Sequence, residues 1–425
     1  MKKRVDLILK KVLEKIEPSK KDLEIINNSL KNVIKELKKR IKKSKIKAEI
    51  FIGGSFAKKT VIKKDKYDVD VFLRFDKKYK KENISKITKK ILNKMKNLSI
   101  IHGSRDYFKI SFSPDFSIEV IPVIKVNNPK EAENITDLSY SHVNYIKKKI
   151  KNKKILDEIR IAKAFCYANK CYGAESYIHG FSGYSLELLV YYYKNFMNFV
   201  KAMANLKNKE IIDIEKHFKK KKNILMDLNE SKLLSPIILI DPTYKQRNAL
   251  AALSLETFRG FQKACKKFLK NPSIKDFELK KENLEKIKKD SKKRKLEFII
   301  IKIKTNKQKG DVAGSKLLKF YKYLEKEIEE FFVIKKKGFE YNQEQSAEIF
   351  FVAKKRNEKI IPGPKIEDKK NLKSFKKKHK KTFVKNKKIY AKEKITFRLK
   401  DFLKKWMKKN KKRLKEMYIS QLKIV

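Results

Sequence analysis

The sequence predicts an α+β protein of several domains: a small mixed sheet, then a helical domain, then an α+β C-terminal region. Three observations predict this class. Short apolar runs dominate residues 49–124, helical patterns follow from about 137 to 228, and strand-like and helix-like segments mix again after 236. A chain of 425 residues is also too long for one ordinary core, so two to four domains are expected.

The N-terminal part predicts two helices followed by the mixed sheet. Apolar residues recur at helical spacing from Val5 to Leu37, and Pro18 and Ser19 mark a break between two helices. A helix-like stretch is also expected within the sheet region, at 84–97. The expected strands cover residues 49–53, 68–75, 107–112 and 116–124.

The remaining chain predicts a helical domain and a mixed C-terminal region. Helices over 137–228 are followed by an Ile-rich strand at 236–242 and another helix from near Asn248. We expect three domains, with boundaries at 1–136, 137–255 and 256–425. The later elements are a hinge or solvated helix face at 283–296, strands at 296–304 and 348–355, a helix at 315–330, and short strands before a final basic helix at 396–417.

The net charge of +63 indicates a polyanionic partner. Lys and Arg total 112 residues against 49 Asp and Glu, and 11 of the basic residues are Arg. A general bias toward lysine explains part of this excess as a solvated surface, but it does not explain the small number of acids. Nucleic acid is therefore the leading candidate.

A membrane location is not favoured, because the sequence contains no apolar run of 18 residues. The three cysteines, Cys166, Cys171 and Cys265, are isolated and show no CxxC spacing. Such cysteines are typical of a reducing compartment, so the sequence predicts a cytoplasmic protein.

The stretch FIGGSFAKKTVIKKDKYDVDVFLRF, residues 51–75, carries the strongest chemical signal. Its Gly-Gly-Ser turn, residues 53–55, follows an apolar segment and can present backbone N–H groups to a phosphate. Asp68 and Asp70 lie two apart in the next apolar run, so both carboxylates leave the same face of a strand. Two adjacent carboxylates repel each other, and a shared divalent metal ion stabilises them. Each feature alone is typical of a tight turn or a solvated acid pair; together they predict a triphosphate site beside a metal site.

A third acidic ligand is expected, because two-metal nucleotidyl transfer normally uses three. The strand-like FSIEVIPVIKV offers Glu119, which apolar residues flank, while Asp115 lies four residues earlier and is the weaker candidate. With three carboxylates, one Mg²⁺ can lower the pKa of an attacking hydroxyl while another holds the triphosphate and stabilises leaving pyrophosphate. The predicted reaction is in-line attack on the α-phosphorus of a nucleotide.

These motifs resemble a known family. GGSFAKKT followed by DVDVF is similar to the signature of the polymerase-β-like nucleotidyltransferases, and later stretches resemble the archaeal, class I CCA-adding enzymes. The resemblance is strong from about residue 50 to 260 and fainter at GPKIEDKKNLKSFKKKH. The RRDxxxN and EDxxR runs expected of class II enzymes are not present in the sequence. The later stretches are EVIPVIKVNNPKEAENITDLSYSHVNYI, IRIAKAFCYANKCYGAESYIHGFSGYSLELLV and ILIDPTYKQRNALAALS.

The resemblance implies roles for residues of the turn. Gly54, Ser55 and Lys58 would bind the triphosphate. Lys58 stands where the family has Arg, so the charge is kept but the forked geometry is not. Glu119 stands where the family usually has Asp, one methylene shorter.

The resemblance also implies nucleotide-binding residues in the helical domain. His142, Lys163 and Tyr172 match positions that grip the phosphates and sugar, and Arg247 matches the arginine that helps to recognise the edge of the incoming base. Taken singly, these residues are more typical of a capping or surface histidine, a solvent-facing lysine, a core tyrosine and a salt-bridged arginine. Arg247 carries the clearest signal of its own, because arginine is scarce in this chain and this one follows a strand and turn.

The implied function is template-independent addition or repair of the 3′-terminal CCA of tRNA from CTP and ATP, with Mg²⁺ as cofactor. The partners would be the tRNA acceptor stem and 3′ end, the chain would not act at a membrane, and a homodimer is compatible with the sequence. The lysine-rich C-terminal region would follow tRNA phosphates. Two alternatives stay open: another terminal nucleotidyltransferase, of the poly(A) polymerase or oligoadenylate synthetase type, and a catalytically inert RNA-binding relative. The acidic trio argues against inertness, and the segments around Tyr172 and Arg247 favour CCA addition.

Overall fold

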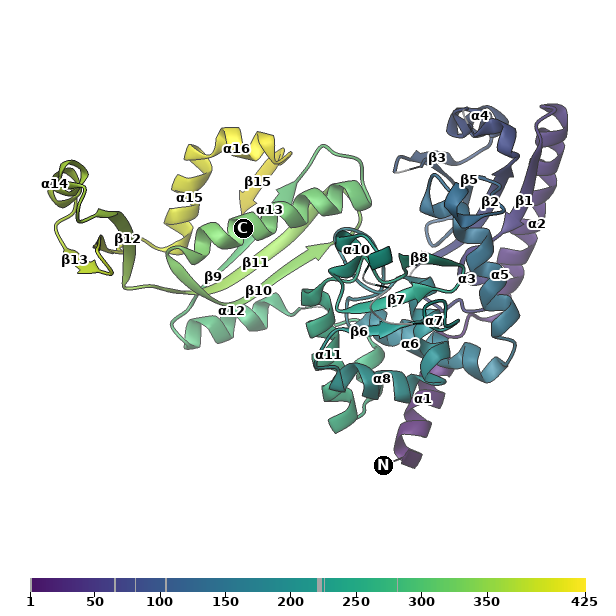
Figure 1. Ribbon diagram of the computed structural model, residues 1–425, viewed down its shortest axis with the longest axis horizontal. Coiled ribbons are helices and arrows are strands. Elements are labelled where there is room, and N and C mark those ends of the chain that lie inside the picture. Colours follow the sequence, from purple (N-terminus) through teal and green to yellow (C-terminus); the bar gives the residue numbers. More distant parts are fainter. Residues whose placement is uncertain are drawn as a thin grey trace. The chain divides into compact units, whose positions relative to one another are not determined.

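The computed structural model describes residues 2–64, 66–80, 82–103, 105–219, 224, 226–280 and 282–425. The chain forms two compact units, Met1–Lys280 and Lys281–Val425. Each unit packs helices against sheets in which antiparallel pairs dominate (Figure 1), so the predicted α+β class is confirmed.

The first sheet has the strand order β1-β2-β5-β4-β3. β2 and β5 pair in parallel, and the other neighbours pair antiparallel. The four predicted strands are confirmed, and β3 is an addition that the sequence did not predict. The strands are β1 (Ala48–Ile52), β2 (Tyr67–Phe75), β3 (Leu98–Ile101), β4 (Tyr107–Ser113) and β5 (Phe116–Ile124).

Helices cover one face of this sheet, and the opposite face carries polar residues of β2 and β5 together with a small apolar cluster of Phe72, Ile121 and Val123. α2 (Lys20–Lys43) and α4 (Ile84–Ile91) lie beside this sheet (Figure 1). They supply apolar side chains to the same core as β2 and β5. On β2, Val69, Val71 and Leu73 point into this core. Because side chains alternate along a strand, the residues between them face away from the helices.

The two N-terminal helices form as the sequence predicts. α1 (Lys2–Ile16) ends before Pro18, and Ser19 caps α2 in a reciprocal capping box with Asp22. α1 does not pack on the sheet; its Val5 and Leu9 lie in the core of the helical section.

The helical section follows the sheet and shares one core with α1. Its core is rich in phenylalanine, with Phe165, Phe196 and Phe261 in mutual ring contacts. The helices are α5 (Ser139–Lys149), α6 (Lys153–Ala168), α7 (Gly183–Tyr193), α8 (Phe196–Asn205), the short α10 (Glu230–Leu233) and α11 (Leu255–Lys270). Single 3-10 turns lie at Lys77–Tyr79, Pro129–Glu131, Ile135–Leu138 and Ile274–Phe277.

Two sequence predictions in this section are wrong. The helical pattern does not continue to 228, because β6 (Glu210–Ile212) pairs with the Ile-rich β7 (Ile237–Asp241); residues 220–223 and 225 of that prediction lie outside the described residues. The start of the next helix is also wrong: this helix is α11, and it begins at Leu255 rather than near Asn248, because Asn248 ends β8 (Tyr244–Asn248). The Asn248 side chain accepts hydrogen bonds from two backbone N–H groups and closes the turn after the hairpin.

The C-terminal unit holds a four-stranded antiparallel sheet in the order β10-β11-β9-β15 and a three-stranded sheet in the order β12-β14-β13. The predicted strands at 296–304 and 348–355 and the helix at 315–330 are confirmed, residues 283–296 are mostly helix, and β15 was not predicted. The strands are β9 (Glu297–Lys304), β10 (Phe332–Tyr341), β11 (Ser346–Lys355), β12 (Glu358–Lys365), β13 (Thr382–Lys385), β14 (Lys388–Lys394) and β15 (Gln421–Ile424). The helices are α12 (Leu284–Lys293), α13 (Asp311–Glu329), α14 (Lys369–Lys378), α15 (Leu399–Lys409) and α16 (Lys411–Glu416).

The division into three domains stays a prediction. The phenylalanines of α11 lie in the same core as those of α6 and α8, so the chain just after residue 255 packs with the helical section. Among the described residues, no helix is both long and apolar enough to cross a membrane.

Candidate active site

The three predicted acids lie on the same face of two neighbouring strands. Asp68 and Asp70 are on β2, and Asp70 is the register partner of Glu119 on β5. The even-numbered residues of β2 and the odd-numbered residues of β5 face away from the helix-covered core, so the three carboxylates share the polar face. Asp115, the weaker candidate, lies in the turn before β5, where its carboxylate accepts a hydrogen bond from Ser113.

Two residues that sequence reasoning missed contact this group. Lys109 on β4 is the register partner of Glu119, and its Nζ lies 3.3 Å from Asp68 Oδ1 and 3.8 Å from Glu119 Oε1. Ser117 donates a hydrogen bond of 2.8 Å to Asp68 Oδ1. No hydrogen bond or ion pair joins the Asp70 carboxylate to another described residue. Side chains alternate between the two faces along β4 and β5, and this alternation could have placed Lys109 and Ser117 on the same face as the acids.

The three carboxylates of the site carry more negative charge than the neighbouring Lys109 can neutralise. Burial raises the pKa of Asp70 to about 6. Burial, together with the charges of Asp70 and Asp68, raises the pKa of Glu119 to about 7. Burial acts in the same direction on Asp68, but the charge of Lys109 and the hydrogen bond from Ser117 outweigh it and lower the pKa of Asp68.

These donors fit a hard divalent cation. Mg²⁺ prefers carboxylate oxygens, and unneutralised carboxylates gain most from a cation. Across the described ranges, no three Asp, Glu, His or Cys side chains already stand together as a metal-binding group. The ammonium of Lys109 lies within 4 Å of both Asp68 and Glu119, so a cation bound by both carboxylates would have to displace it.

The glycine turn lies directly against Asp70. Gly53 donates its backbone N–H to the Asp70 carbonyl at 2.8 Å. Gly54 begins α3 (Gly54–Ala57) with φ +60°, and a Cβ placed there would lie 1.7 Å from Asp70 Oδ2. Position 54 therefore requires glycine both for its backbone conformation and for space. Ser55, the next predicted residue, is half-buried in α3.

Lys58 and Lys163 lie in one buried cluster around Glu187 of α7. Lys58 Nζ donates to Glu187 Oε2 at 2.6 Å, and Lys163 Nζ donates to Glu187 Oε1 at 2.8 Å. Thr60 donates its hydroxyl to Glu187 Oε1 at 2.9 Å. The side chains of Lys58, Lys163 and Glu187 are 8%, 1% and 0% exposed, so Lys163 is not the solvent-facing lysine that composition alone would suggest.

Glu187 is ionised despite its burial. Burial raises the pKa of a carboxyl, but the charges of Lys163 and Lys58 and their hydrogen bonds outweigh this and lower the pKa of Glu187 to about 2. Sequence reasoning missed Glu187, although an acid between leucines in GYSLELLVYYY is the same signal that pointed to Glu119.

Tyr172 lies beside this cluster. It forms an isolated parallel bridge with Phe181, and its hydroxyl would be 3.0 Å from a Cβ placed at Gly183. Burial and then the charge of Glu187 raise the pKa of Tyr172, which puts the hydroxyl near the Lys58 and Glu187 charges.

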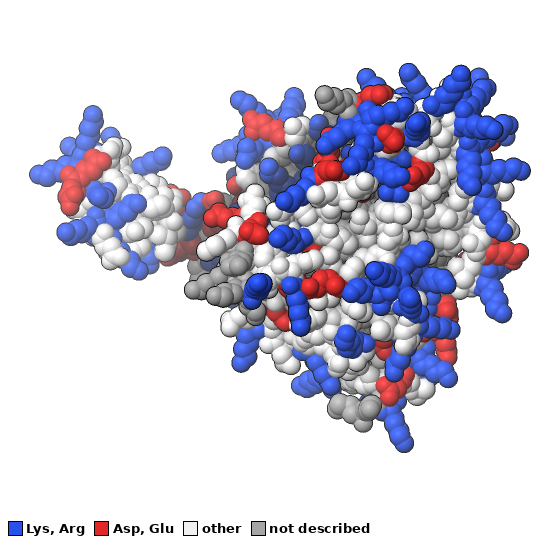
Figure 2. All heavy atoms as spheres, turned by 45° about the vertical axis from the view of Figure 1, so that its right-hand side comes forward, with Lys and Arg blue, Asp and Glu red and all other residues white. Residues whose placement is uncertain are grey.

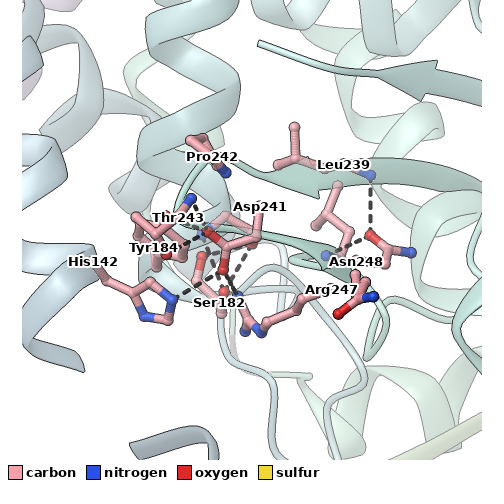
Figure 3. Close-up of polar contacts among 12 residues, drawn as sticks. His142, Ser182, Tyr184, Leu239, Asp241, Pro242, Thr243, Arg247 and Asn248 are labelled. Carbon is pink, nitrogen blue, oxygen red and sulfur yellow. Dashed lines mark hydrogen bonds and ion pairs between the residues drawn. The ribbon is translucent and has the colours of Figure 1, made fainter. Parts of the chain in front are cut away.

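His142 and Arg247 meet at Asp241, the last residue of β7 (Figure 3). His142 Nε2 lies 2.9 Å from Asp241 Oδ2, and Arg247 Nη1 donates to the same oxygen at 2.6 Å. The other oxygen, Oδ1, accepts from the Tyr184 hydroxyl at 3.0 Å and from the Thr243 backbone and hydroxyl at 2.8 Å each. The rings of His142 and Tyr184 stack with centroids 4.1 Å apart.

The hydrogen-bonded group around Asp241 holds the side chain of Arg247 in place. Asp241 is fully buried. Burial raises the pKa of its carboxyl, but contacts with His142 and Arg247 outweigh this effect and lower the pKa. His142 is buried too, and burial lowers its pKa although Asp241 opposes this. Tyr184 and Glu187 are three residues apart on α7, so one face of this helix contacts both polar clusters.

Comparison with known proteins identifies the class. Residues 157–278 match the family model described as tRNA nucleotidyltransferase, second domain, and residues 2–156 match that of the Second Messenger Oligonucleotide or Dinucleotide Synthetase domain. A cytoplasmic RNA terminal U-transferase shares the fold, with TM-score 0.50, 13% identity and coverage of 66% of this chain and 100% of that one. The Cid1 poly(U) polymerase does so with TM-score 0.50, 12% identity and coverage of 64% and 98%. The family model and the shared fold identify the class as a nucleotidyltransferase.

Curated relatives narrow this class. The CCA-adding enzyme of Nanoarchaeum equitans is 40% identical over 247 residues, 58% of this chain and 60% of that protein. The CCA-adding enzyme of Methanocaldococcus jannaschii is 28% identical over 91% of this chain and 87% of that protein. The chain is thus similar to archaeal CCA-adding enzymes over most of its length. The match spans 60% of the Nanoarchaeum relative and 56% of the Methanosarcina acetivorans relative, which is 30% identical.

Proposed function

We propose that this protein adds or repairs the 3′-terminal CCA of tRNA, using CTP and ATP without a template. The observation that carries the proposal is the face formed by Asp68, Asp70 and Glu119 beside the Gly54 turn. Similarity to curated CCA-adding enzymes supports the choice of tRNA as substrate. In the proposed reaction the 3′-hydroxyl oxygen attacks the α-phosphorus, the bond to the β-phosphate breaks, and pyrophosphate leaves.

Asp68, Asp70 and Glu119 would hold two Mg²⁺ ions. When bound, these ions would lower the pKa of the attacking hydroxyl and stabilise the leaving pyrophosphate. The parallel pairing of β2 and β5 fixes the spacing of the carboxylates before any substrate arrives. The Gly54 backbone limits where the Asp70 carboxylate can turn, because it lies in van der Waals contact with that side chain.

The nucleotide would bind between the turn and the helical section. Ser55 and Lys58 would contact the triphosphate, and the buried position of Lys58 strengthens its attraction for phosphate by excluding water. Tyr172 lies near the same charges and would hold the sugar or phosphates. Arg247, held by Asp241, would present its remaining N–H donors to the base.

His142 and Lys163 would support the nucleotide from within the protein. His142 braces Asp241, and Lys163 contributes charge from behind Lys58. In the proposal, base choice therefore depends on Arg247 together with the RNA 3′ end, because no template strand is present.

The excess of lysine supports tRNA as the partner. Figure 2 shows Lys and Arg side chains spread over the surface, with fewer Asp and Glu between them. Six of the ten residues of α14, KKNLKSFKKK, are lysines, and all six are exposed, so this helix could contact several phosphates. We place this activity in the cytoplasm, in line with three unpaired cysteines.

The test is an extension assay on labelled tRNA that lacks CCA. The protein is incubated with CTP alone, ATP alone and both nucleotides. Two additions with CTP and a third only when both are present would support the proposal. A long A tail would instead assign a poly(A) polymerase type of activity. RNA binding without extension would favour an inert relative.

A further inference from the structure

We propose that Glu187 is a positioning residue that aims Lys58 at the triphosphate of the incoming nucleotide. This inference rests on the proposed nucleotide-binding function and adds a residue that does not itself touch the substrate. Its basis is the buried cluster that joins Lys58, Thr60 and Lys163 to one carboxylate.

The cluster joins two parts of the N-terminal unit. Lys58 and Thr60 follow α3 and belong to the segment that leaves the glycine turn. Lys163 comes from α6 and Glu187 from α7. The two oxygens of Glu187 take different partners, since Oε2 binds Lys58 while Oε1 binds Lys163 and Thr60. One side chain thus fixes the turn against the helical section.

The hydrogen bonds distinguish the two lysines. An ammonium has three donors, and Lys163 directs all of them to protein acceptors, namely Thr60 O at 3.3 Å, Thr60 Oγ1 at 2.7 Å and Glu187 Oε1 at 2.8 Å. The Lys58 ammonium makes one hydrogen bond, to Glu187, among the described residues. Lys58 is therefore the lysine with donors left for a phosphate, and Lys163 braces the cluster.

The charge balance suits this role. Two lysines and one glutamate leave one net positive charge, and without Glu187 two buried ammonium groups would repel each other. The other titratable groups near Lys58 are Asp70 on β2, His142 on α5 and Tyr172 after α6. Of these, Asp70 is the remaining acid, and it belongs to the acidic face. Glu187 is thus the carboxylate that can fix Lys58 without occupying the reaction site.

A purely structural role makes a different prediction. If Glu187 only stabilised the fold, its loss would lower the unfolding temperature and leave the affinity of the folded protein for triphosphate unchanged. A positioning role requires weaker triphosphate binding that depends on Lys58. A double-mutant cycle between the two residues separates these cases.

The experiment uses four full-length proteins: wild type, Glu187→Gln, Lys58→Met and the double variant. Calorimetry measures how tightly each protein binds inorganic tripolyphosphate and ATP. Steady-state kinetics give KM and kcat for CTP incorporation. We expect Glu187→Gln to raise both dissociation constants and KM about tenfold, the effect of losing roughly one charged hydrogen bond, with a smaller change in kcat. In the Lys58→Met background the same substitution should change the dissociation constants less than twofold. Glu187→Asp keeps the negative charge on a side chain one methylene shorter, so it should cause an intermediate loss of triphosphate affinity. If Glu187→Gln does not fold, Glu187→Asp takes its place in the comparison.

The matched control is Asp276→Asn, which removes another buried carboxylate paired with a lysine in the same unit. It should lower thermal stability and leave tripolyphosphate binding unchanged. Unchanged binding in Glu187→Gln, or full additivity with Lys58→Met, would overturn the positioning role while leaving the proposed function intact. Failure of the wild-type protein to bind either ligand would overturn both.

Discussion

Replacing Gly54 with alanine tests the closest contact in the acidic face. The substituted Cβ would lie 1.7 Å from Asp70 Oδ2, so the carboxylate would have to move by about 1 Å or more. The positive φ of +60° adds a backbone cost of about 1–2 kcal/mol for a residue with a side chain. Because a misplacement of about 1 Å in an active site costs on the order of 10²-fold in rate, we expect Gly54→Ala to extend tRNA at least 10²-fold more slowly.

The assay compares extension rates at saturating nucleotide with thermal unfolding. Gly260→Ala is the first control, because no described atom beyond the neighbouring backbone of its own helix α11 lies within 4 Å of the added Cβ. This substitution should raise the free energy of unfolding by about 0.5–1 kcal/mol. Gly310→Ala is the second, because it has φ +88° but open space, so it carries the backbone strain alone. An extension rate of Gly54→Ala within twofold of wild type would refute the idea that this contact sets the position of Asp70.

Further substitutions and conditions test the charges of the same face. Asp68→Ala and Asp70→Ala should each abolish extension. Their affinity for tRNA in a mobility-shift assay should stay within about twofold of wild type, because lysines elsewhere contact the phosphates. Residual extension in either variant would contradict the proposal that these residues bind the metal. Lys109→Met should tighten Mn²⁺ binding measured by electron paramagnetic resonance, because it removes the ammonium within 4 Å of two carboxylates; equal or weaker binding would show that Lys109 does not compete. The pKa of Glu119 is about 7 in the folded protein and near 4.5 in the unfolded chain. The free energy of unfolding that this carboxyl contributes is therefore fully present below pH 4.5 and is lost as the pH rises through 7. Urea unfolding of metal-free protein should therefore show this loss between pH 5 and 8, and a profile that Glu119→Gln leaves unchanged would refute it.

The sequence predicted the elements whose signals are local. β2 and β5 follow from apolar residues in short runs, and Glu119 stood out because an acid among apolar residues requires a partner. β6 and β8 were missed because their three and five residues gain their stability from pairing with β7, which is a tertiary contact.

The missed site residues have different causes. Lys109 is one of very many lysines, so its alternation with Phe108 and Ile110 on β4 was the one local signal that it lies on the same face as the acids. Asp241 and Glu187 carried a usable signal, since both interrupt strongly apolar segments. What the sequence could not supply is their partners, because residue pairs such as Lys58 and Glu187 are 129 positions apart.

The parallel pairing of β2 and β5 also has a consequence for how the protein folds. Asp68 and its contact Ser117 are 49 residues apart, and β3, β4 and α4 lie in the chain between the two strands. The loop must close before the strands can pair, and contacts of such long sequence separation form slowly. The closing step also brings ionised carboxylates together, so it works against electrostatic repulsion. We therefore expect the acidic face to form late in folding, and no nascent chain that ends before Glu119 can carry it.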